Sequence, residues 1–266
     1  MISEQKKNKK LFFLIAMPRS GNTLLASIIN QNKDLVVTAN SITLEIMKEL
    51  YLLKEEEVFQ NFPDHKSLNN IIDVVYDLYY KDWPQKIIID RGPVLASGNP
   101  GNFELIKIHY KRPFKCIVLL RDLMDVLASY MKWYTENPNA FINKLGNTDE
   151  EKLLKLMENN GAIAKELNAI TNSFKYPNMC HFVKYDDLTT HPEEEIKKIY
   201  KFIDEPYFNH RFINLDQINI NGLSYNDNVV GTDMHTVKKE KIEKTYNPYI
   251  EKIPQSIREK YGHIKF

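Results

Sequence analysis

A short apolar run that ends in Pro-Arg-Ser-Gly-Asn-Thr is the feature that most constrains the fold of this chain. The run is LFFLIAM, Leu11–Met17, and the residues from Asn22 to Asn30 have the pattern of a helix. A continuous apolar run of this length is typical of a parallel strand covered on both faces. The turn between such a strand and a helix lies at the carboxyl edge of the sheet, where the first amide groups of the helix are unpaired and carry a partial positive charge. The segment therefore predicts an anion-binding loop at Pro18–Thr23.

The side chains of this loop favour the same interpretation, although the GxxxxGK[ST] pattern of nucleoside triphosphatases is missing. Gly21 allows the backbone to approach an anion or to take a positive φ. Ser20 and Thr23 add hydroxyl donors, and Arg19 offers a fork that matches phosphate or sulfate. Taken alone, the segment is equally compatible with an ordinary strand–turn–helix corner that has a serine cap and a solvated arginine.

The rest of the chain alternates between strand and helix patterns. Further strands are predicted at Lys86–Asp90, Lys115–Leu120 and Met179–Lys184. Further helices are predicted at Ser41–Leu53, Leu68–Tyr80, Asn102–Tyr110, Leu123–Tyr134, Asp149–Ser173 and Glu193–Ile203. This alternation predicts an α/β fold, a doubly wound parallel sheet flanked by helices with a P-loop-like nucleotide-binding core. We expect one domain over residues 1–266, in which residues 1–10 form a flexible basic leader.

Charge and cysteine content limit the partners and the compartment. Lys and Arg number 36 and Asp and Glu 35, a net charge of +1, so we expect no nucleic-acid partner and any basic site must be local. Cys116 and Cys180 lie in apolar strand-like runs and match no zinc spacing, which favours buried reduced thiols. The lysines before Leu11 and the apolar run after them together resemble a signal peptide, but no small-x-small cleavage site follows. No run approaches the roughly 20 apolar residues of a membrane span. We therefore expect a cytoplasmic protein.

A second stretch repeats the arrangement of the first. CIVLLRDLMDVLASYMKWY, which begins at Cys116, is an apolar strand, then Arg121 at its exit, then a helix. Ser129 follows Arg121 by eight residues, about two helical turns. The two side chains can flank one anion if the helix folds back across the site. The alternative is that Arg121 pairs with Asp122 or Asp125 and that Ser129 only fills a helix face.

Together the two stretches resemble the sulfotransferases that use 3′-phosphoadenosine 5′-phosphosulfate (PAPS). That family has a Pro-[Lys/Arg]-Ser-Gly-[Thr/Asn]-Thr loop for the 5′-phosphosulfate, which matches Pro18–Thr23. It also has an Arg and a Ser eight residues apart for the 3′-phosphate, which match Arg121 and Ser129. Arg19, and Leu24 where the cytosolic branch has an adenine-stacking Trp, resemble the bacterial and tyrosylprotein-type branches.

Two weaker likenesses extend the resemblance over most of the chain. The segment VKYDDL looks like the family's Tyr-Glu-Asp-Leu segment, whose tyrosine lies near the adenine, so Tyr185 is the matching position. The segment MHTVKKEKIEK lies where several branches have a basic residue that closes over the donor, and Lys238 or Lys239 would match.

The resemblance implies in-line transfer of a sulfuryl group from PAPS to a hydroxyl or amine, which leaves 3′,5′-bisphosphoadenosine (PAP). Arg19 would stabilise the charge that develops on the leaving 5′-phosphate oxygen. A sulfuryl group carries less charge than a γ-phosphate, so the loop donors could suffice without Mg²⁺. No acidic cluster with metal-ligand spacing occurs in the sequence. We therefore expect a reaction without metal.

The general base has several candidates. The cytosolic branch has a histidine after its next strand, but this chain has Asp90 and Arg91 there. Arg91 matches a lysine of the tyrosylprotein branch and is a further catalytic candidate. That branch's glutamate base falls by motif position on Asn40, which cannot accept a proton. Glu45 and Asp90 are the remaining acidic candidates, and His235 is the third choice.

Two other functions stay open at this point. A P-loop kinase fits the strand–loop–helix start but lacks the GK[ST] residues and the metal carboxylates. A non-catalytic protein of the same fold that binds phosphoadenosine fits the uncertain base. The acceptor is equally open between a lipid, an alcohol, a sugar and a protein tyrosine.

Overall fold

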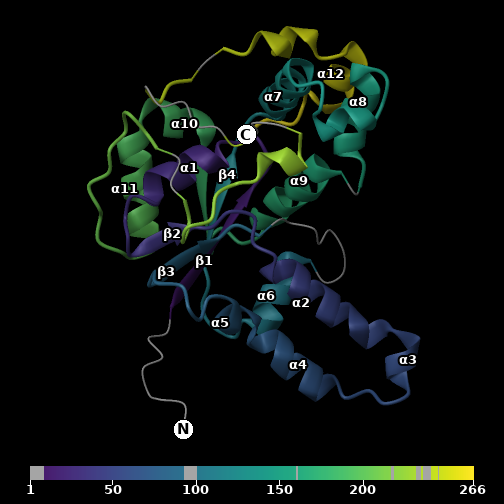
Figure 1. Cartoon of the computed structure of the whole chain (residues 1–266), viewed down its shortest axis with the longest axis vertical. Coiled ribbons are helices and arrows are strands. Elements are labelled where there is room, and N and C mark those ends of the chain that lie inside the picture. The colour runs from purple at the N-terminus through teal and green to yellow at the C-terminus, as the bar shows by residue number, and fades with distance from the viewer. Residues whose placement is uncertain are drawn as a thin grey trace.

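Parallel strands form one sheet within the residues that the computed structural model describes, which are 9–92, 101–159, 161–216, 219–231, 235, 241–244 and 246–266. The strands are β1 (Lys10–Ala16), β2 (Leu35–Val37), β3 (Ile87–Asp90), β4 (Cys116–Leu120) and β5 (Cys180–Lys184). Their order is β2-β3-β1-β4-β5, which places β1 at the centre (Figure 1). The predicted doubly wound parallel sheet is confirmed, and the four predicted strands are present with small shifts at their ends. The short edge strand β2 was not predicted.

Helices connect the strands and cover the sheet. They are α1 (Asn22–Ile29), α2 (Thr43–Leu52), α3 (Glu57–Gln60), α4 (His65–Asp73), α5 (Val75–Tyr79), α6 (Asn102–His109), α7 (Leu123–Glu136), α8 (Asp149–Met157), α9 (Ala162–Ser173), α10 (Tyr185–Thr190), α11 (Pro192–Phe202) and α12 (Gln255–Tyr261). Short 3₁₀ turns are η1 (Leu53–Glu55), η2 (Phe141–Lys144), η3 (Asp227–Val229) and η4 (Pro248–Lys252).

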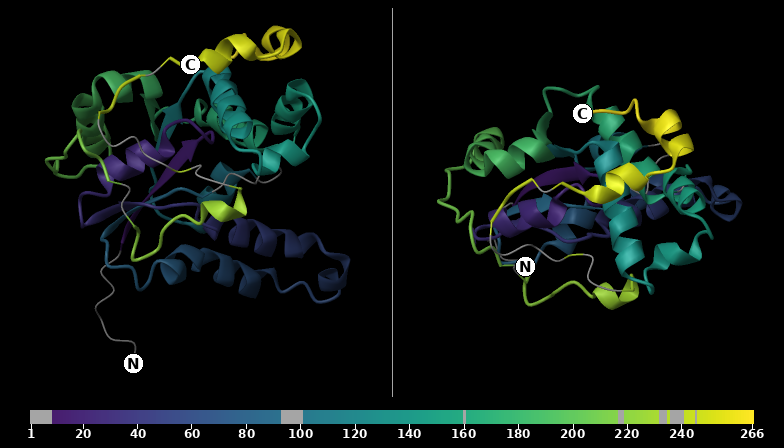
Figure 2. Two further views of the ribbon diagram at one scale, coloured as in Figure 1. Left: turned by 45° about the horizontal axis from the view of Figure 1, so that its top comes forward. Right: turned by 90° about the horizontal axis from the view of Figure 1, so that it is seen from above.

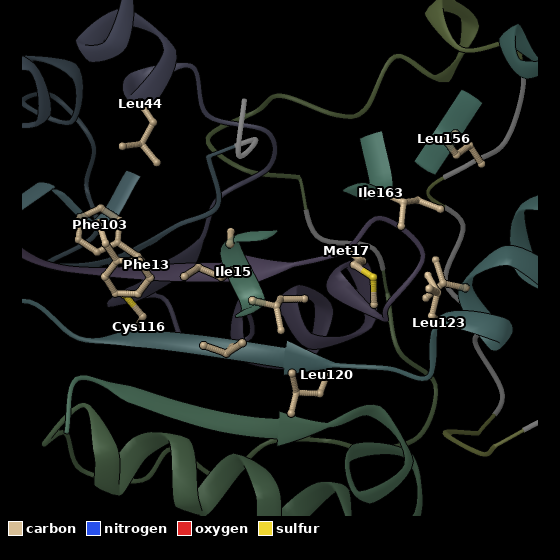
Figure 3. Close-up of a cluster of buried hydrophobic side chains, with 14 of the residues drawn as sticks. Phe13, Ile15, Met17, Leu44, Phe103, Cys116, Leu120, Leu123, Leu156 and Ile163 are labelled. Carbon is tan, nitrogen blue, oxygen red and sulfur yellow. The ribbon is translucent and has the colours of Figure 1, made fainter. Parts of the chain in front are cut away.

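The apolar run of β1 is continuous because both of its faces are buried. Phe13 and Ile15 point into a core that includes Leu44 of α2 and residues of α6, α7 and α9 (Figure 3). Leu14 points to the opposite face, where Leu25 of α1 and residues of α11 cover the sheet. Side chains alternate across a strand, so a strand between two helical layers needs apolar residues at every position.

Two predicted helices are wrong in extent. The segment Leu68–Tyr80 is divided into α4 and α5 at Val74, whose φ of −106° leaves the helical range. The segment Asp149–Ser173 is divided into α8 and α9, and α9 begins after Gly161. A Cβ at Gly161 would lie 2.3 Å from the carbonyl oxygen of Leu156, so this close return of the chain requires glycine.

Local sequence features mark the starts of two helices. Thr148 and Glu151 form a capping box at the start of α8. Pro192 occupies the first turn of α11. The two cysteines are free and buried, and they face each other in the register of β4 and β5.

The connections place a crevice between β1 and β4. The chain leaves β1 through α1, which covers one face of the sheet, and leaves β4 through α7, which covers the other. The ends of these two adjacent strands therefore diverge at the carboxyl edge, where open α/β sheets bind their ligands. Helices α2, α3 and α4 project sideways from this sheet, so that α2 begins beside β3 and runs away from it (Figure 2).

Candidate active site

The loop after β1 is tightly folded and leaves the N-terminus of α1 open. Arg19 has a φ of 66° and Gly21 a φ of 96°, both in the left-handed region. The Ser20 amide donates to the Met17 carbonyl oxygen at 3.3 Å, and Asn22 Nδ2 donates to the same oxygen at 3.0 Å. Among the described residues, no side chain caps α1. The N-terminus of α1 is thus suited to an anion, and the binding of an anion there stays a prediction.

The two predicted motifs meet directly. β1 and β4 are neighbours, with Ala16 opposite Leu119, so the loops that follow them lie side by side. Arg121 Nη1 donates to the carbonyl oxygen of Arg19 at 2.6 Å, and Arg19 Nε donates to Ser129 Oγ at 3.1 Å. Helix α7 therefore folds back across the first loop, as the spacing of Arg121 and Ser129 required.

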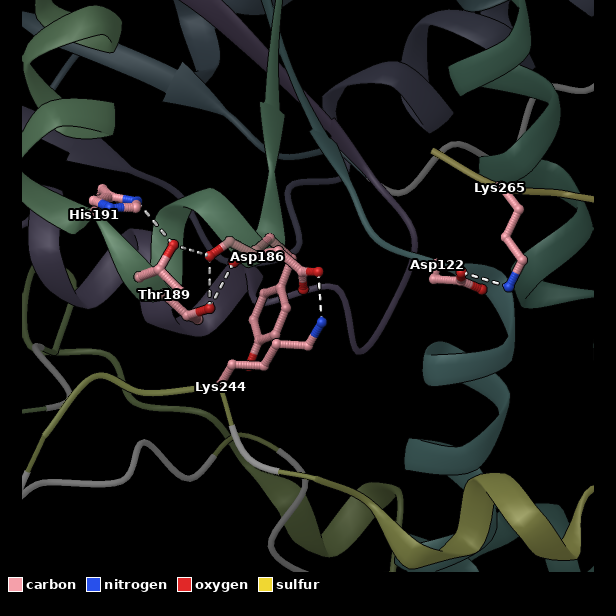
Figure 4. A network of polar contacts seen from close by, with 8 residues as sticks. Asp122, Asp186, Thr189, His191, Lys244 and Lys265 are labelled. Carbon is pink, nitrogen blue, oxygen red and sulfur yellow. Dashed lines mark hydrogen bonds and ion pairs between the residues drawn. The ribbon is translucent and has the colours of Figure 1, made fainter.

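The alternative ion pair of Arg121 with Asp122 or Asp125 does not occur among the described residues. Asp122 caps α7 by accepting from the Met124 amide at 3.0 Å and pairs with Lys265 Nζ at 2.7 Å (Figure 4). Arg121 Nε is buried and has no hydrogen-bond partner among the described residues. A buried donor in this state is suited to an added acceptor.

Tyr185 stands next to both loops. Its ring lies under the Arg121 guanidinium, 4.1 Å from Cζ to the ring centroid. A Cβ at Gly21 would lie 2.6 Å from Tyr185 Cδ2, so glycine allows the tyrosine to pack on the loop. Lys244 pairs with Asp186 at 2.5 Å and ties the C-terminal part of the chain to α10 (Figure 4).

These residues open onto a cavity of about 380 Å³. Its walls include Pro18, Arg19, Gly21, Asn22, Thr23, Leu24, Arg91, Arg121, Ser129, Lys132, Trp133, Tyr185, His235, Lys241, Tyr246 and Asn247. Ser20 is fully buried and does not line it; its hydroxyl has no partner among the described residues. Lys238 and Lys239 lie outside the described residues, so their predicted role stays a prediction.

Asp90 is the last residue of β3, directly before Arg91 in the sequence, and is 1% exposed. Thr43 Oγ1 donates to its Oδ2 at 2.6 Å, and Thr38 Oγ1 donates to its Oδ1 at 3.5 Å. Burial raises the pKa of the Asp90 carboxyl, and the hydroxyl hydrogen bonds oppose this effect. The neighbouring hydroxyl of Ser41 bonds to Thr43 at 2.7 Å. Asp90 is therefore a buried carboxyl group that accepts hydrogen bonds from hydroxyl groups at the start of α2.

Glu45, in the first turn of α2, has a different environment. Both of its carboxylate oxygens are buried and lack a hydrogen-bond partner among the described residues. Burial, with a smaller contribution from the negative charge of Asp90, raises the pKa of Glu45 to about 7. A carboxyl with this pKa exchanges a proton readily near neutral pH. Asp90 and Glu45 do not line the cavity described above.

Arg91 connects the start of α2 to the cavity. Its guanidinium lines the cavity, and Nη1 donates to Asn40 Oδ1 at 2.8 Å. Its backbone carbonyl accepts from the Ser41 amide at 2.9 Å, and its amide donates to Thr38 Oγ1 at 2.8 Å. Asn40, which falls by motif position on the base of the tyrosylprotein branch, thus accepts a hydrogen bond from Arg91 in this chain.

Sequence reasoning missed the two lysines of the cavity wall. Lys132 lies three residues after Ser129 on α7, so helical spacing alone places it on the same face and could have identified it. Lys241 follows the predicted pair Lys238 and Lys239 closely, and no separate sequence signal marks it.

Neither a metal-ligand cluster nor a membrane-spanning helix is present in the described ranges. No group of three or more His, Cys, Asp or Glu side chains there is placed to hold a metal ion. None of the described helices is both long and apolar enough to cross a bilayer. A reaction without metal stays a prediction.

Comparison with known proteins agrees with the motifs. The sequence profile of the sulfotransferase domain matches residues 9–245. No curated protein matches the chain. A solved sulfotransferase domain from the curacin biosynthetic pathway matches with 17% identity over 97% of this chain and 99% of that chain, at a TM-score of 0.57.

Two further solved structures are less similar. The sulfotransferase domain of an olefin synthase from Synechococcus PCC 7002 has 16% identity over 99% of this chain and 91% of that chain, with a TM-score of 0.48. A mouse sulfotransferase complexed with PAP has 17% identity over 77% of this chain and 62% of that chain, with a TM-score of 0.46. The profile match covers most of the sequence and includes both loops of the cavity, and the curacin-pathway domain shares the fold. The chain therefore belongs to the family of PAPS-dependent sulfotransferases.

Proposed function

We propose that the cavity at the ends of β1 and β4 binds PAPS and that this site transfers the sulfuryl group to a hydroxyl or amine of an acceptor. The convergence of Arg19, Arg121 and Ser129 carries the proposal. Burial lowers the pKa of Arg19, and the positive charge of Arg121 also lowers it. Two cations held close in a partly buried cavity are unfavourable alone, and an anion between them removes the repulsion.

The two loops contact different parts of the donor PAPS. The loop Pro18–Thr23 and the first amide groups of α1 face the 5′-phosphosulfate, Arg121 and Ser129 face the 3′-phosphate, and Tyr185 lies by the adenine. Lys132 and Lys241 line the same cavity and add positive charge. Arg19 donates to the leaving oxygen as the bond between sulfur and the 5′-phosphate oxygen breaks.

Glu45, in the first turn of α2 near Asp90 and outside the walls of the donor cavity, is the base that we propose for the acceptor. As the acceptor oxygen or nitrogen forms its bond to sulfur, its proton passes to the Glu45 carboxylate, whose oxygens lack other partners among the described residues. Asp90 is better suited to positioning, because Thr43 and Thr38 already donate to it. Its negative charge also helps to keep the pKa of Glu45 near neutrality.

Three further parts of the proposal rest on the sequence. The reaction needs no metal, residues 1–266 form one sulfotransferase domain, and the buried reduced thiols fit a cytoplasmic location. The acceptor class stays open.

Transfer of label from sulfur-labelled PAPS into a lysate of the source cell tests the function. Wild type should label a product, which mass spectrometry then identifies, and Arg19→Ala should label almost none. Tight PAP binding without any labelled product would favour the non-catalytic alternative. Turnover of ATP with Mg²⁺ in place of PAPS would favour a kinase.

A further inference from the structure

A histidine outside the two phosphate loops faces the same cavity. His235 lines the cavity together with Arg19 and Arg91, and its side chain is 17% exposed. The PAPS motifs give it no role. Histidine is the side chain whose charge changes most easily near neutral pH, so its surroundings decide whether it can bind an anion.

The imidazole of His235 is held in one orientation. Its Nδ1 lies 2.5 Å from Asp227 Oδ1, and its backbone amide donates to Asp227 Oδ2 at 3.0 Å. Its ring stacks on Tyr225 with centroids 4.0 Å apart and an angle of 7° between the planes. Because Nδ1 is engaged by Asp227, Nε2 is the ring nitrogen left to contact a ligand in the cavity.

The charges around His235 oppose each other. Burial lowers the pKa of its imidazole, and the positive charges of Arg91 and Arg19 lower it too, whereas Asp227 raises it. Burial and the arginines that face the donor thus act together against the positive form of the ring. An anion that neutralises those arginines removes the repulsion, so the imidazole can become positive and donate from both nitrogens.

We propose that His235, oriented by Asp227, is a ligand of the donor's anionic groups and takes up a proton when the donor binds. This inference rests on the proposed function, since it needs PAPS or PAP in the cavity. Proton uptake makes donor affinity depend on pH. Each unit by which the bound anion raises the pKa of His235 increases the affinity at acid pH about tenfold. Affinity should then fall as pH rises.

Calorimetric titration of the full chain with PAP tests the inference. The titration is run at about pH 6.5, the ordinary pKa of histidine, in two buffers of different ionisation enthalpy. Wild type should take up more protons per PAP than His235→Gln, by up to about one proton, because one imidazole titrates. The phosphates of PAP also titrate, with a pKa of about 6, but their contribution cancels between wild type and variant.

Two further variants make the result specific. His181 is a half-buried histidine on β5 whose pKa burial also lowers, and it does not line the cavity. His181→Gln should keep the proton uptake of wild type. Asp227→Asn should reduce the uptake, because the imidazolium loses its carboxylate.

The possible failures are distinguishable. Equal proton uptake by wild type and His235→Gln, with PAP bound by both, would overturn the role of His235 and leave the proposed function intact. No binding of PAP by wild type would overturn the proposed function and this inference with it.

Discussion

The proposed donor side, which is the two loops after β1 and β4, and the proposed acceptor side, which is the surroundings of Glu45, are built in different ways. On the donor side, Arg19 and Arg121 follow adjacent strands directly and are fixed by backbone carbonyl and hydroxyl groups. On the acceptor side, Glu45 lies in the first turn of a helix that projects from the sheet, and its carboxylate lacks a hydrogen-bond partner among the described residues. In the proposed function, the first arrangement fixes charge for binding, while the second leaves a proton acceptor available. The difference teaches that binding and proton transfer can be separated by mutation.

Glu45→Gln should have the largest effect. Removal of a general base typically costs about 10²–10⁴-fold in rate, and the substitution keeps the size of the side chain. In wild type, kcat should rise with pH through about 7, because the carboxylate must be ionised to accept a proton. The variant should lose both the rate and this limb of the pH profile. A variant that keeps the limb near pH 7 would assign the base to another residue.

Stability gives an independent check on Glu45. Its folded pKa of about 7 lies above the ordinary 4.5, so the folded state binds more protons between these values. The carboxyl therefore destabilises the protein progressively as pH rises through this window. Thermal unfolding should show that Glu45→Gln gains stability relative to wild type above neutral pH and gains less in acid. An equal effect at both pH values would show that the pKa of Glu45 is not raised.

Arg19→Ala should come next. Loss of one donor to a developing negative charge costs about 10²–10³-fold in kcat, while the open amide groups of α1 should still bind the donor. Arg19→Lys should keep part of the rate, because lysine retains the charge. Pre-steady-state kinetics with PAPS separates the two effects. If affinity falls as much as the transfer rate, Arg19 only clamps the donor.

Gly21→Ala should destabilise the donor side moderately. A left-handed residue with a Cβ costs about 1–2 kcal/mol, and here the new methyl group would also press on Tyr185. Gly222 is a matched control, since its φ is 82° and a Cβ added there would meet nothing within 4 Å among the described residues. Urea unfolding should give a larger loss for Gly21→Ala than for Gly222→Ala. Equal losses would show that Tyr185 does not constrain the loop.

The two sides also differ in how well the sequence predicts them. The donor loops follow continuous apolar strands, and parallel strands bring their carboxyl ends to one edge, so Arg19 and Arg121 could be placed in advance. The surroundings of Asp90 could not be predicted, because they depend on the hydroxyl groups of Thr38 and Thr43, which only the tertiary packing brings to this carboxyl group. Periodicity likewise does not show a break between two helices of similar pattern, as at Val74.

The physical reason for glycine at position 21 was only partly foreseen. The positive φ is confirmed. The sequence also suggested that a side chain there would block the approach of backbone to an anion, whereas the structure places the ring of Tyr185 against this residue. No local pattern connects positions so far apart in the chain.

EDTA should have the smallest effect on either side. The donor side relies on arginine, lysine and amide groups, so PAP affinity and the transfer rate should be unchanged after chelation. Loss of activity that Mg²⁺ restores would reopen the kinase interpretation.

Calorimetry with PAP on Arg121→Ala and Glu45→Gln tests the separation of binding from proton transfer most directly. Loss of charge-assisted bonds from Arg121 costs about 1.5–3 kcal/mol, or about 10–150-fold in affinity. Arg121→Ala should show this loss for PAP and little change for adenosine monophosphate, which has no 3′-phosphate. Glu45→Gln should bind PAP as wild type does. Equal losses for PAP and adenosine monophosphate, or a loss of PAP affinity in Glu45→Gln as large as in Arg121→Ala, would contradict the account.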